Sequence, residues 1–216
     1  MITISCIATD MNLPDYSEVH EKMVATRYRL QEDETRLAAI AACLKKDTVL
    51  ELYSGVGGTT RLYKEAFDKI VTNDINPSSI ATHKMSALKF IRTLLPIMAD
   101  KIDLVDFDCY GSPSEEIKAF FEERDSQDVP IVVAFADGLG LWLKRCKKDE
   151  RTARVRRRYL LSSDFQFDES HPWREHDRII EEFMKQIAKK YGMKCKKIST
   201  IQTPHKNYVI GSYLFT

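Results

Sequence analysis

The run Thr48-Val49-Leu50-Glu51-Leu52-Tyr53, followed directly by Ser54-Gly55-Val56-Gly57-Gly58, decides the fold class of this 216-residue chain. The first six residues are mostly apolar or β-branched, which indicates a short strand. The glycines end that strand, and the segment from there to Phe67 has the composition of a helix. Strand, glycine-rich turn and helix in this order predict the first unit of a parallel α/β sheet.

Strands and helices alternate along the rest of the chain. Further strands are expected at 69–73, 80–85, 102–107 and 130–136. Helices are expected at 23–45, 87–95, 113–123 and 171–191. Two last strands, 195–203 and 208–215, flank a turn and predict a terminal hairpin. The fold class predicted is α/β and Rossmann-like, with a mainly parallel sheet whose carboxy-terminal hairpin is antiparallel.

Length and composition favour one domain over residues 1–216. We divide it into a helical lead, 1–47, a Rossmann-like core, 48–143 and 173–216, and a basic insertion, 144–172. The chain has no apolar run of the roughly 20 residues that a membrane span needs. Its five cysteines show no CxxC spacing, which argues against a disulfide framework or a zinc site. A cytoplasmic protein without a metal or a membrane partner is expected.

The informative residues are those expected where strands end, because ligands of open α/β sheets bind outside the carboxyl ends of the strands. Glycines let a backbone approach a ligand closely, and Asp74, at the end of the second strand, can accept both hydroxyls of a ribose. The turn is not GxGxxG and lacks the Lys-Ser/Thr pair of a P-loop, so an adenosine ligand without phosphate is favoured. The alternative is that Gly55 to Gly58 only close a tight strand-helix turn.

From residue 48 to 216 the chain resembles the class I S-adenosylmethionine-dependent methyltransferases. Within them, Asn73-Asp74-Ile75 and residues 106–113, Asp-Phe-Asp-Cys-Tyr-Gly-Ser-Pro, are most similar to the tRNA guanine N2-dimethyltransferases. That family has Asp-x-Asp-Pro-Phe/Tyr-Gly-Ser-Pro after strand four, and Thr-Ala-Thr-Asp where this chain has Ala134-Phe135-Ala136-Asp137. Cys109 replaces the proline, Ser86-Ala87 replaces Asp-Ala, and the family's carboxy-terminal RNA-binding domain has no counterpart here.

The resemblance implies S-adenosylmethionine as the cofactor and a set of residues that bind it. These are Tyr53, Ser54, Gly55, Gly57, Asp74, Ile75, Ser86 and Asp106. It also implies that Asp108 holds the target amino group and accepts its proton, with Tyr110 as a ring that stacks on the base. The family uses an arginine of its leading helix for the cofactor carboxylate, which leaves Arg27, Arg29 and Arg36 as candidates.

A basic run between residues 143 and 158 is the feature that bears directly on a nucleic-acid partner. It carries nine Lys/Arg against two acidic residues. Substrate contacts are expected from Lys144, Arg145, Arg154, Arg156, Arg157 and Arg158. The alternative is a solvated helix face. The predicted reaction is methylation of a base nitrogen in nucleic acid, in RNA rather than DNA.

Several other functions remain open at this point. Cys109 is next to the expected reacting acid, and a cysteine thiolate is the nucleophile of C5-pyrimidine methylation. A buried thiol is the simpler explanation. Small-molecule, protein and DNA methyltransferases would use the same domain. An inactive methyltransferase-fold subunit is a further alternative, as is a partner protein that supplies specificity.

Overall fold

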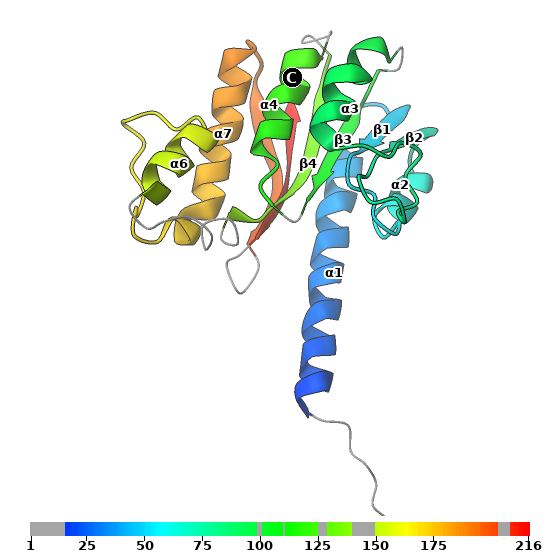
Figure 1. Cartoon of the computed structure of the whole chain (residues 1–216), viewed down its shortest axis with the longest axis horizontal. Helices are drawn as coiled ribbons and strands as arrows, with labels where there is room; N and C mark the ends of the chain where they lie inside the picture. Colours follow the sequence, from blue (N-terminus) through cyan, green and yellow to red (C-terminus); the bar gives the residue numbers. More distant parts are fainter. Residues whose placement is uncertain (1–15, 99–100, 110, 125–128, 140–149, 203–207) are drawn as a thin grey trace, which may run out of the picture.

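The computed structural model describes residues 16–98, 101–109, 111–124, 129–139, 150–202 and 208–216, with side chains from residue 29 on (Figure 1). The helices are α1 Tyr16–Ala42, α2 Thr60–Lys64, α3 Ala87–Thr93, α4 Ser114–Glu123, α6 Arg151–Arg158 and α7 His176–Lys190. The short 3₁₀ turns are η1 Leu95–Ile97 and η3 Pro172–Glu175. The strands are β1 Thr48–Glu51, β2 Lys69–Thr72, β3 Leu104–Asp108, β4 Ile131–Asp137, β5 Cys195–Gln202 and β6 Val209–Phe215.

The described strands form one sheet in the order β2-β1-β3-β4-β6-β5. β1 pairs in parallel with β2 and with β3, and β3 pairs in parallel with β4. β6 runs antiparallel to both β4 and β5. The predicted mainly parallel sheet with an antiparallel carboxy-terminal hairpin is therefore confirmed. The carboxyl ends of β1, β2, β3 and β4 meet along one edge, as in other open α/β sheets.

The strand predicted at 80–85 is wrong. That segment makes only an isolated parallel bridge between Asn73 and His83. Its amides are satisfied differently, because the Thr82 N–H donates to the Thr72 hydroxyl at 2.9 Å and the His83 N–H donates to the Thr72 carbonyl at 3.1 Å. The Thr72 hydroxyl thus accepts an N–H of this segment in place of a backbone carbonyl, and the pairing with β2 does not extend beyond one bridge.

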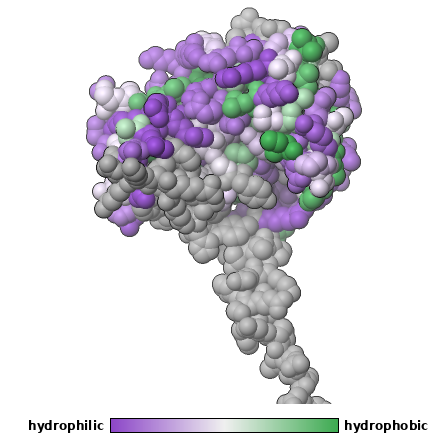
Figure 2. All heavy atoms as spheres, viewed as in Figure 1, coloured by the Kyte–Doolittle hydropathy of each residue, from purple (hydrophilic) through white to green (hydrophobic). Residues whose placement is uncertain are grey.

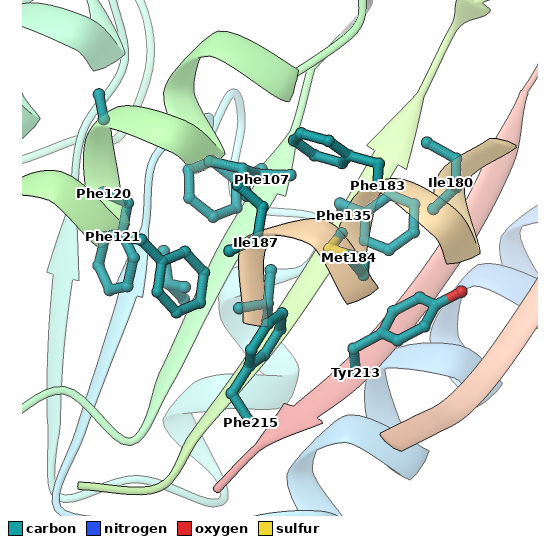
Figure 3. Close-up of a cluster of buried hydrophobic side chains, with 14 of the residues drawn as sticks. Phe107, Phe120, Phe121, Phe135, Ile180, Phe183, Met184, Ile187, Tyr213 and Phe215 are labelled. Atoms are coloured by element: carbon teal, nitrogen blue, oxygen red, sulfur yellow. The ribbon is translucent and has the colours of Figure 1, made fainter. Parts of the chain in front are cut away.

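Each face of the sheet buries a separate hydrophobic cluster, because successive strand residues point to opposite faces. Leu50, Val105, Val133 and Phe135 point toward α3, α4 and α7, where aromatic side chains from helices and strands fill the space (Figure 3). Val49, Leu104, Val132 and Ala134 point the other way, toward Ala39 and Ile40 of α1 and Tyr63 of α2. Helices on both faces complete the three layers of an α/β fold.

The carboxy-terminal part of helix α1 packs on β4, β5 and β6, and its amino-terminal part extends beyond the carboxyl edge of the sheet (Figure 1). The expectation was a lead helix at 23–45, so the helix begins and ends earlier than its apolar spacing indicated. Arg36, Ala39 and Ile40 are buried on its inner face, whereas Leu30 and Leu37 are exposed on its outer face. α1 thereby brings polar side chains to the edge where the parallel strands end.

The surface on the side of α3, α4 and α7 is mostly hydrophilic, with small scattered hydrophobic groups (Figure 2). Within the part of the chain that the structure describes, no helix combines the length and apolar character needed to cross a membrane. The predicted basic insertion, 144–172, contains α6 in its described part, 150–172. Val155 and Tyr159 anchor α6 in the same core as α7.

Candidate active site

The glycine-rich loop after β1 is held by the carboxylate of Asp74, which follows β2. One carboxylate oxygen accepts the Gly55 N–H at 2.8 Å, and the other accepts the Asn76 N–H at 2.8 Å. The loop is fixed further because the Ser54 N–H donates to the Asn73 carbonyl at 3.3 Å. Asp74 therefore joins the ends of two adjacent strands, and each of its oxygens retains lone pairs for a further donor, such as the ribose hydroxyl expected from the sequence.

The two predicted glycines of this loop both have left-handed backbone conformations. Gly55 has φ of +50° and Gly57 has φ of +89°, which side chains rarely adopt. A Cβ on Gly57 would lie 2.7 Å from Cδ1 of Ile80, so another residue there would both strain the backbone and displace the end of that side chain. A Cβ on Gly55 would meet no described atom within 4 Å. The loop is therefore packed against Ile80 at Gly57 and has open space beside Gly55.

Two buried polar atoms beside this loop have no hydrogen-bond partner among the described residues. They are the hydroxyl oxygen of Ser54 and the amide oxygen of Asn73. Asn73 itself is held by its amide nitrogen, which donates to the carbonyls of Leu52 and Met85. Buried polar atoms are nearly always paired in folded proteins, so both oxygens fit a site that a polar ligand completes.

The rim of the loop exposes large apolar side chains. Val56 is 89% exposed and Ile75 is 69% exposed, and Ile80 is half exposed where its N–H bonds to the Gly55 carbonyl at 2.9 Å. Ile75 was predicted to contact the cofactor, and its side chain is free to do so. Exposed apolar groups gathered at a polar loop are a common feature of ligand-binding surfaces.

Tyr53 and Ser86, also predicted to bind the cofactor, have partners within the protein. The Tyr53 hydroxyl donates to Glu116 of α4, and burial is the main cause that raises the pKa of Tyr53 above its usual range. Ser86 is the N-cap of α3, where its hydroxyl accepts the Lys89 N–H at 3.3 Å. That cap accounts for the serine without a ligand.

Asp106 requires a correction, because its carboxylate is fully buried under α1 and α2. Arg36 Nε donates to Oδ2 at 2.8 Å, and the Tyr63 hydroxyl donates to the same oxygen at 2.7 Å. A carboxylate enclosed in this way has no surface on which a cofactor could bind. Asp106 is a positioning residue that holds the Arg36 guanidinium, and not the direct cofactor contact that was predicted.

Asp108 lies two residues further along β3 and remains accessible at the carboxyl edge. Its side chain is 28% exposed, and Oδ1 lies 3.7 Å from Nη2 of Arg36. Burial raises the pKa of Asp108, the Arg36 charge lowers it, and the charge of Glu32 in α1 raises it.

A second carboxyl group, Glu51 at the end of β1, belongs to the same cluster. The Thr60 hydroxyl donates to Glu51 at 2.6 Å. Burial raises the pKa of Glu51 to about 7, against the lowering effect of the Thr60 bond, and the charges of Asp106 and Asp108 raise it further. Arg36 is thus surrounded by several acids.

Cys109 is a protonated thiol in this arrangement. Burial raises its pKa to about 12, and its sulfur lies 3.8 Å from the carbonyl of Ala136. A thiolate nucleophile needs a lowered pKa, so the geometry favours the buried-thiol interpretation over covalent C5-pyrimidine chemistry. Tyr110, the predicted stacking ring, lies outside the described residues.

The arginines of the leading helix divide into different environments. Arg36 is fully buried against Asp106 and also donates to the Phe135 carbonyl at 3.3 Å. Arg29 is exposed, and its Nη2 lies 3.3 Å from the position that a Cβ on Gly58 would take. The side chain of Arg27 lies outside the described residues. Of the two arginines that are described, only Arg29 presents an accessible guanidinium at the glycine-rich loop.

The predicted substrate arginines of α6 are partly used inside the protein. Arg158 donates to the Ser112 carbonyl at 2.8 Å, and Arg156 donates to the Ser162 and Phe165 carbonyls at 2.7 and 3.1 Å. Arg154 pairs with Glu150 at 2.6 Å on the surface. Arg157 is exposed. Lys144 and Arg145 lie outside the described residues.

Asp137, at the end of β4, collects a second polar cluster. The Asp137 carboxylate accepts hydrogen bonds from four groups. They are the Tyr159 hydroxyl at 2.8–2.9 Å, Ser112 Oγ at 2.9 Å, His176 Nε2 at 2.8 Å and the Leu139 N–H at 2.9 Å. All four side chains of this cluster are buried. Among the described residues no group of three or more His, Cys, Asp or Glu side chains is arranged to hold a metal ion.

Several of these residues escaped the sequence analysis. Glu32, Glu51 and Tyr63 carry no motif of their own, and helical spacing of Glu32 and Arg36 on one face of α1 was the only available signal. Tyr159 and His176 reach Asp137 from 22 and 39 residues away in sequence. No local pattern connects groups at such separations.

Comparison with known proteins gives a likeness of fold. No family model matches the sequence, and no curated protein matches it. A candidate hemolysin from Lactococcus lactis is 12% identical with a TM-score of 0.53, each chain being covered to 86%. The plantazolicin methyltransferase BpumL, solved with SAH, is 14% identical with a TM-score of 0.50, over 95% of this chain and 91% of that chain. The predicted Rossmann-like α/β fold is confirmed.

Proposed function

We propose that this protein is an S-adenosylmethionine-dependent methyltransferase that acts on a base nitrogen of RNA. The observation that carries the proposal is the pair of strand-end acids at one edge of the sheet. Asp74 holds the glycine-rich loop through the Gly55 N–H, and Asp108 remains accessible beside the Arg36 guanidinium. One acid organises a ligand loop, and the other is placed to act on a substrate.

The residues around the loop fit S-adenosylmethionine. Asp74 has lone pairs for ribose hydroxyls, the unpaired oxygens of Ser54 and Asn73 suit polar groups, and Ile75 offers an apolar surface to a purine. Arg29, exposed at Gly58, suits a carboxylate. When bound, this cofactor supplies an electrophilic methyl group on a positively charged sulfur.

Asp108 is the residue that handles the target nitrogen. An exocyclic amine conjugated to a base is a weak nucleophile, and an acceptor that orients its N–H aims the lone pair and lowers the barrier. The amine must lose a proton once it has gained a methyl group. Asp108 takes that proton, and the nearby Arg36 stabilises the carboxylate before transfer.

The exposed side of α6 supports a nucleic-acid substrate. Arg157 is exposed there, and Arg154 lies on the surface in an ion pair of the kind that salt and competing phosphates readily exchange. With Arg156 and Arg158 bound internally, the phosphate contacts on described residues are fewer than the sequence indicated. A modest salt dependence of binding follows.

The same internal bonds favour a second candidate, a methyltransferase for a small molecule. If α6 is a structural cover, its arginines need no phosphate partner. In that case the site would accept a compact nucleophile next to Asp108, and added salt would leave turnover unchanged.

Transfer of a labelled methyl group from S-adenosylmethionine tests the proposal. The protein is incubated with bulk tRNA or with duplex DNA, at low and high salt, and the labelled nucleoside is identified. We expect labelled base in RNA, less of it at high salt, and none with Asp108→Asn. Cofactor binding without label in either nucleic acid would favour the small-molecule candidate.

A further inference from the structure

The polar cluster at the end of β4 joins segments that are distant in sequence. Ser112 belongs to the loop that follows β3, Tyr159 caps the end of α6, and His176 begins α7. All three donate to Asp137. The Tyr159 hydroxyl oxygen also lies 2.8 Å from Ser112 Oγ, so the loop and α6 are in direct contact as well as joined through the carboxylate.

Backbone bonds tie the same loop to the same place. The Gly138 N–H donates to the Gly111 carbonyl at 2.8 Å, and Arg158 donates to the Ser112 carbonyl at 2.8 Å. The loop therefore receives bonds from β4 and from α6. It starts at Asp108, the accessible acid of the proposed site, only a few residues before Ser112.

The end of α6 is itself held in an unfavourable conformation. Leu160 has φ of +54°, the one non-glycine residue with positive φ among those described. The left-handed region is unfavourable for a residue with a side chain. Such strain persists where surrounding bonds fix the conformation. Both neighbours of Leu160 are held by hydrogen bonds: the Tyr159 hydroxyl donates to Asp137, and the Leu161 N–H donates to the Arg156 carbonyl at 2.9 Å.

We infer that Tyr159 and Asp137 are positioning residues, which hold the loop after β3 and so fix the carboxyl end of that strand, where Asp108 lies. The inference rests on the proposed function. Tyr159 is buried and touches no substrate, so it acts through the loop.

Tyr159→Phe isolates that hydroxyl, since the ring keeps its edge-on packing against Phe183 at 5.7 Å between centroids. Tyr213→Phe is the matched control. The Tyr213 hydroxyl is buried in β6 and has no hydrogen-bond partner among the described residues. Ser112→Ala removes the same connection from the side of the loop and serves if Tyr159→Phe does not fold.

The experiment measures kcat and KM for methyl transfer to bulk tRNA, calorimetric affinity for S-adenosylmethionine, and amide hydrogen exchange of the segment 111–114. For Tyr159→Phe we expect kcat to fall about tenfold to a hundredfold, as for a misplaced reacting group. Cofactor affinity should stay unchanged, because Asp74 and the glycine-rich loop lie on the other side of β3. Exchange of 111–114 should accelerate, and Tyr213→Phe should behave as the wild type.

A kcat within twofold of the wild type, or an unchanged rate of exchange in 111–114, would overturn the inference. A fall in melting temperature alone, equal in both tyrosine variants, would do the same. Failure of the proposed function looks different, because the wild type would then transfer no methyl group to RNA. Amide exchange needs no turnover, so it still decides whether Tyr159 holds the loop.

Discussion

The two halves of the carboxyl edge are built in different ways. At β1 and β2, Asp74 binds backbone N–H groups of Gly55 and Asn76, both close to it in the chain or on the adjacent strand. At β3 and β4, side chains bind side chains, as with Arg36 and Asp106 or Tyr159 and Asp137. The first half is a loop shaped for a ligand. The second is a set of buried polar groups arranged around one accessible acid, Asp108.

This difference suggests separate tasks for the two halves: the glycine-rich loop holds a ligand, and the side-chain cluster carries the acid that reacts. Backbone donors fix the glycine-rich loop whatever the side chains around it are, which suits a ligand that every turnover requires. Side-chain networks in a low-dielectric environment respond to single substitutions, because each unpaired buried group is costly. Substitutions at Asp74 and the glycine-rich loop should therefore change affinity for a cofactor, and substitutions in the side-chain cluster around Arg36, Glu51 and Asp108 should change rate, stability or pH dependence.

The largest effect is expected for Asp108→Asn. An amide cannot take the proton of the target nitrogen, and loss of such a general base costs about 10²- to 10⁴-fold in rate. We expect that loss in kcat for methyl transfer, with the affinity for S-adenosylmethionine within a factor of two or so of the wild type. The measurement is steady-state transfer of labelled methyl groups, with calorimetry of the cofactor alongside.

Cys109→Ala is the matched control for this prediction, because its thiol is protonated and adjacent in sequence. The variant should keep wild-type turnover. Abolished activity in Cys109→Ala, together with retained activity in Asp108→Asn, would assign the reaction to the cysteine and contradict the role of the acid.

Arg36→Met should have the next largest effect, on folding. It removes the buried cation between α1 and β3 and leaves the Asp106 carboxylate uncompensated. Removing one partner of a buried ion pair typically costs about 3–5 kcal/mol, and we expect a loss of about that size in the free energy of unfolding. Urea denaturation followed by circular dichroism measures the change in the free energy of unfolding.

Arg61→Met provides the comparison, since Arg61 of α2 pairs with Asp33 of α1 on the surface, where the Arg61 side chain is 52% exposed. A surface pair contributes about 0–1 kcal/mol. Equal losses in the free energy of unfolding for Arg36→Met and Arg61→Met would show that the buried ion pair stabilises the fold no more than the surface pair does.

A smaller effect, on pH dependence, is expected for Glu51. Burial raises the pKa of Glu51 from 4.5 to about 7 in the folded protein, so its protonated form favours folding. That contribution is present below pH 4.5 and is lost as the pH rises through 7. Glu51→Gln removes this loss and should be more stable than the wild type above pH 7 by about 3 kcal/mol.

The free energy of unfolding, measured from pH 4 to pH 8 in both proteins, tests this. Thr60→Val sharpens it, because Thr60 donates to the ionised form of Glu51 and its removal should move the wild-type decline to higher pH. Parallel curves for the wild type and Glu51→Gln would contradict the assignment.

The sequence was a good guide to the first half of the site and a poor one to the second. A glycine-rich turn after a strand, with Asp74 at the next strand end, is a local pattern, and the structure brings the two together at 2.8 Å. The alternation of strands and helices likewise predicted the sheet and its antiparallel hairpin. Asp106 and Asp108 are two residues apart, so their shared face of β3 follows from the alternation of side chains along a strand.

What the sequence could not show is which buried groups pair. Asp106 looked accessible because no local feature reveals that Arg36, 70 residues earlier, covers it. The basic run looked like a phosphate-binding surface, yet Arg156 and Arg158 bind carbonyls that only the folded loop provides. The short strand at 80–85 failed because a threonine hydroxyl competes with the backbone for its amides.

Calorimetric titration of S-adenosylmethionine into the wild type and Asp74→Ala tests the central claim most directly. The account predicts micromolar binding to the wild type and a loss of about 1.5–3 kcal/mol in the variant, as for hydrogen bonds to a charged group. It also predicts that Arg61→Met binds as the wild type does. Absence of binding to the folded wild type, or equal affinity in Asp74→Ala, would contradict the assignment of this edge as a cofactor site.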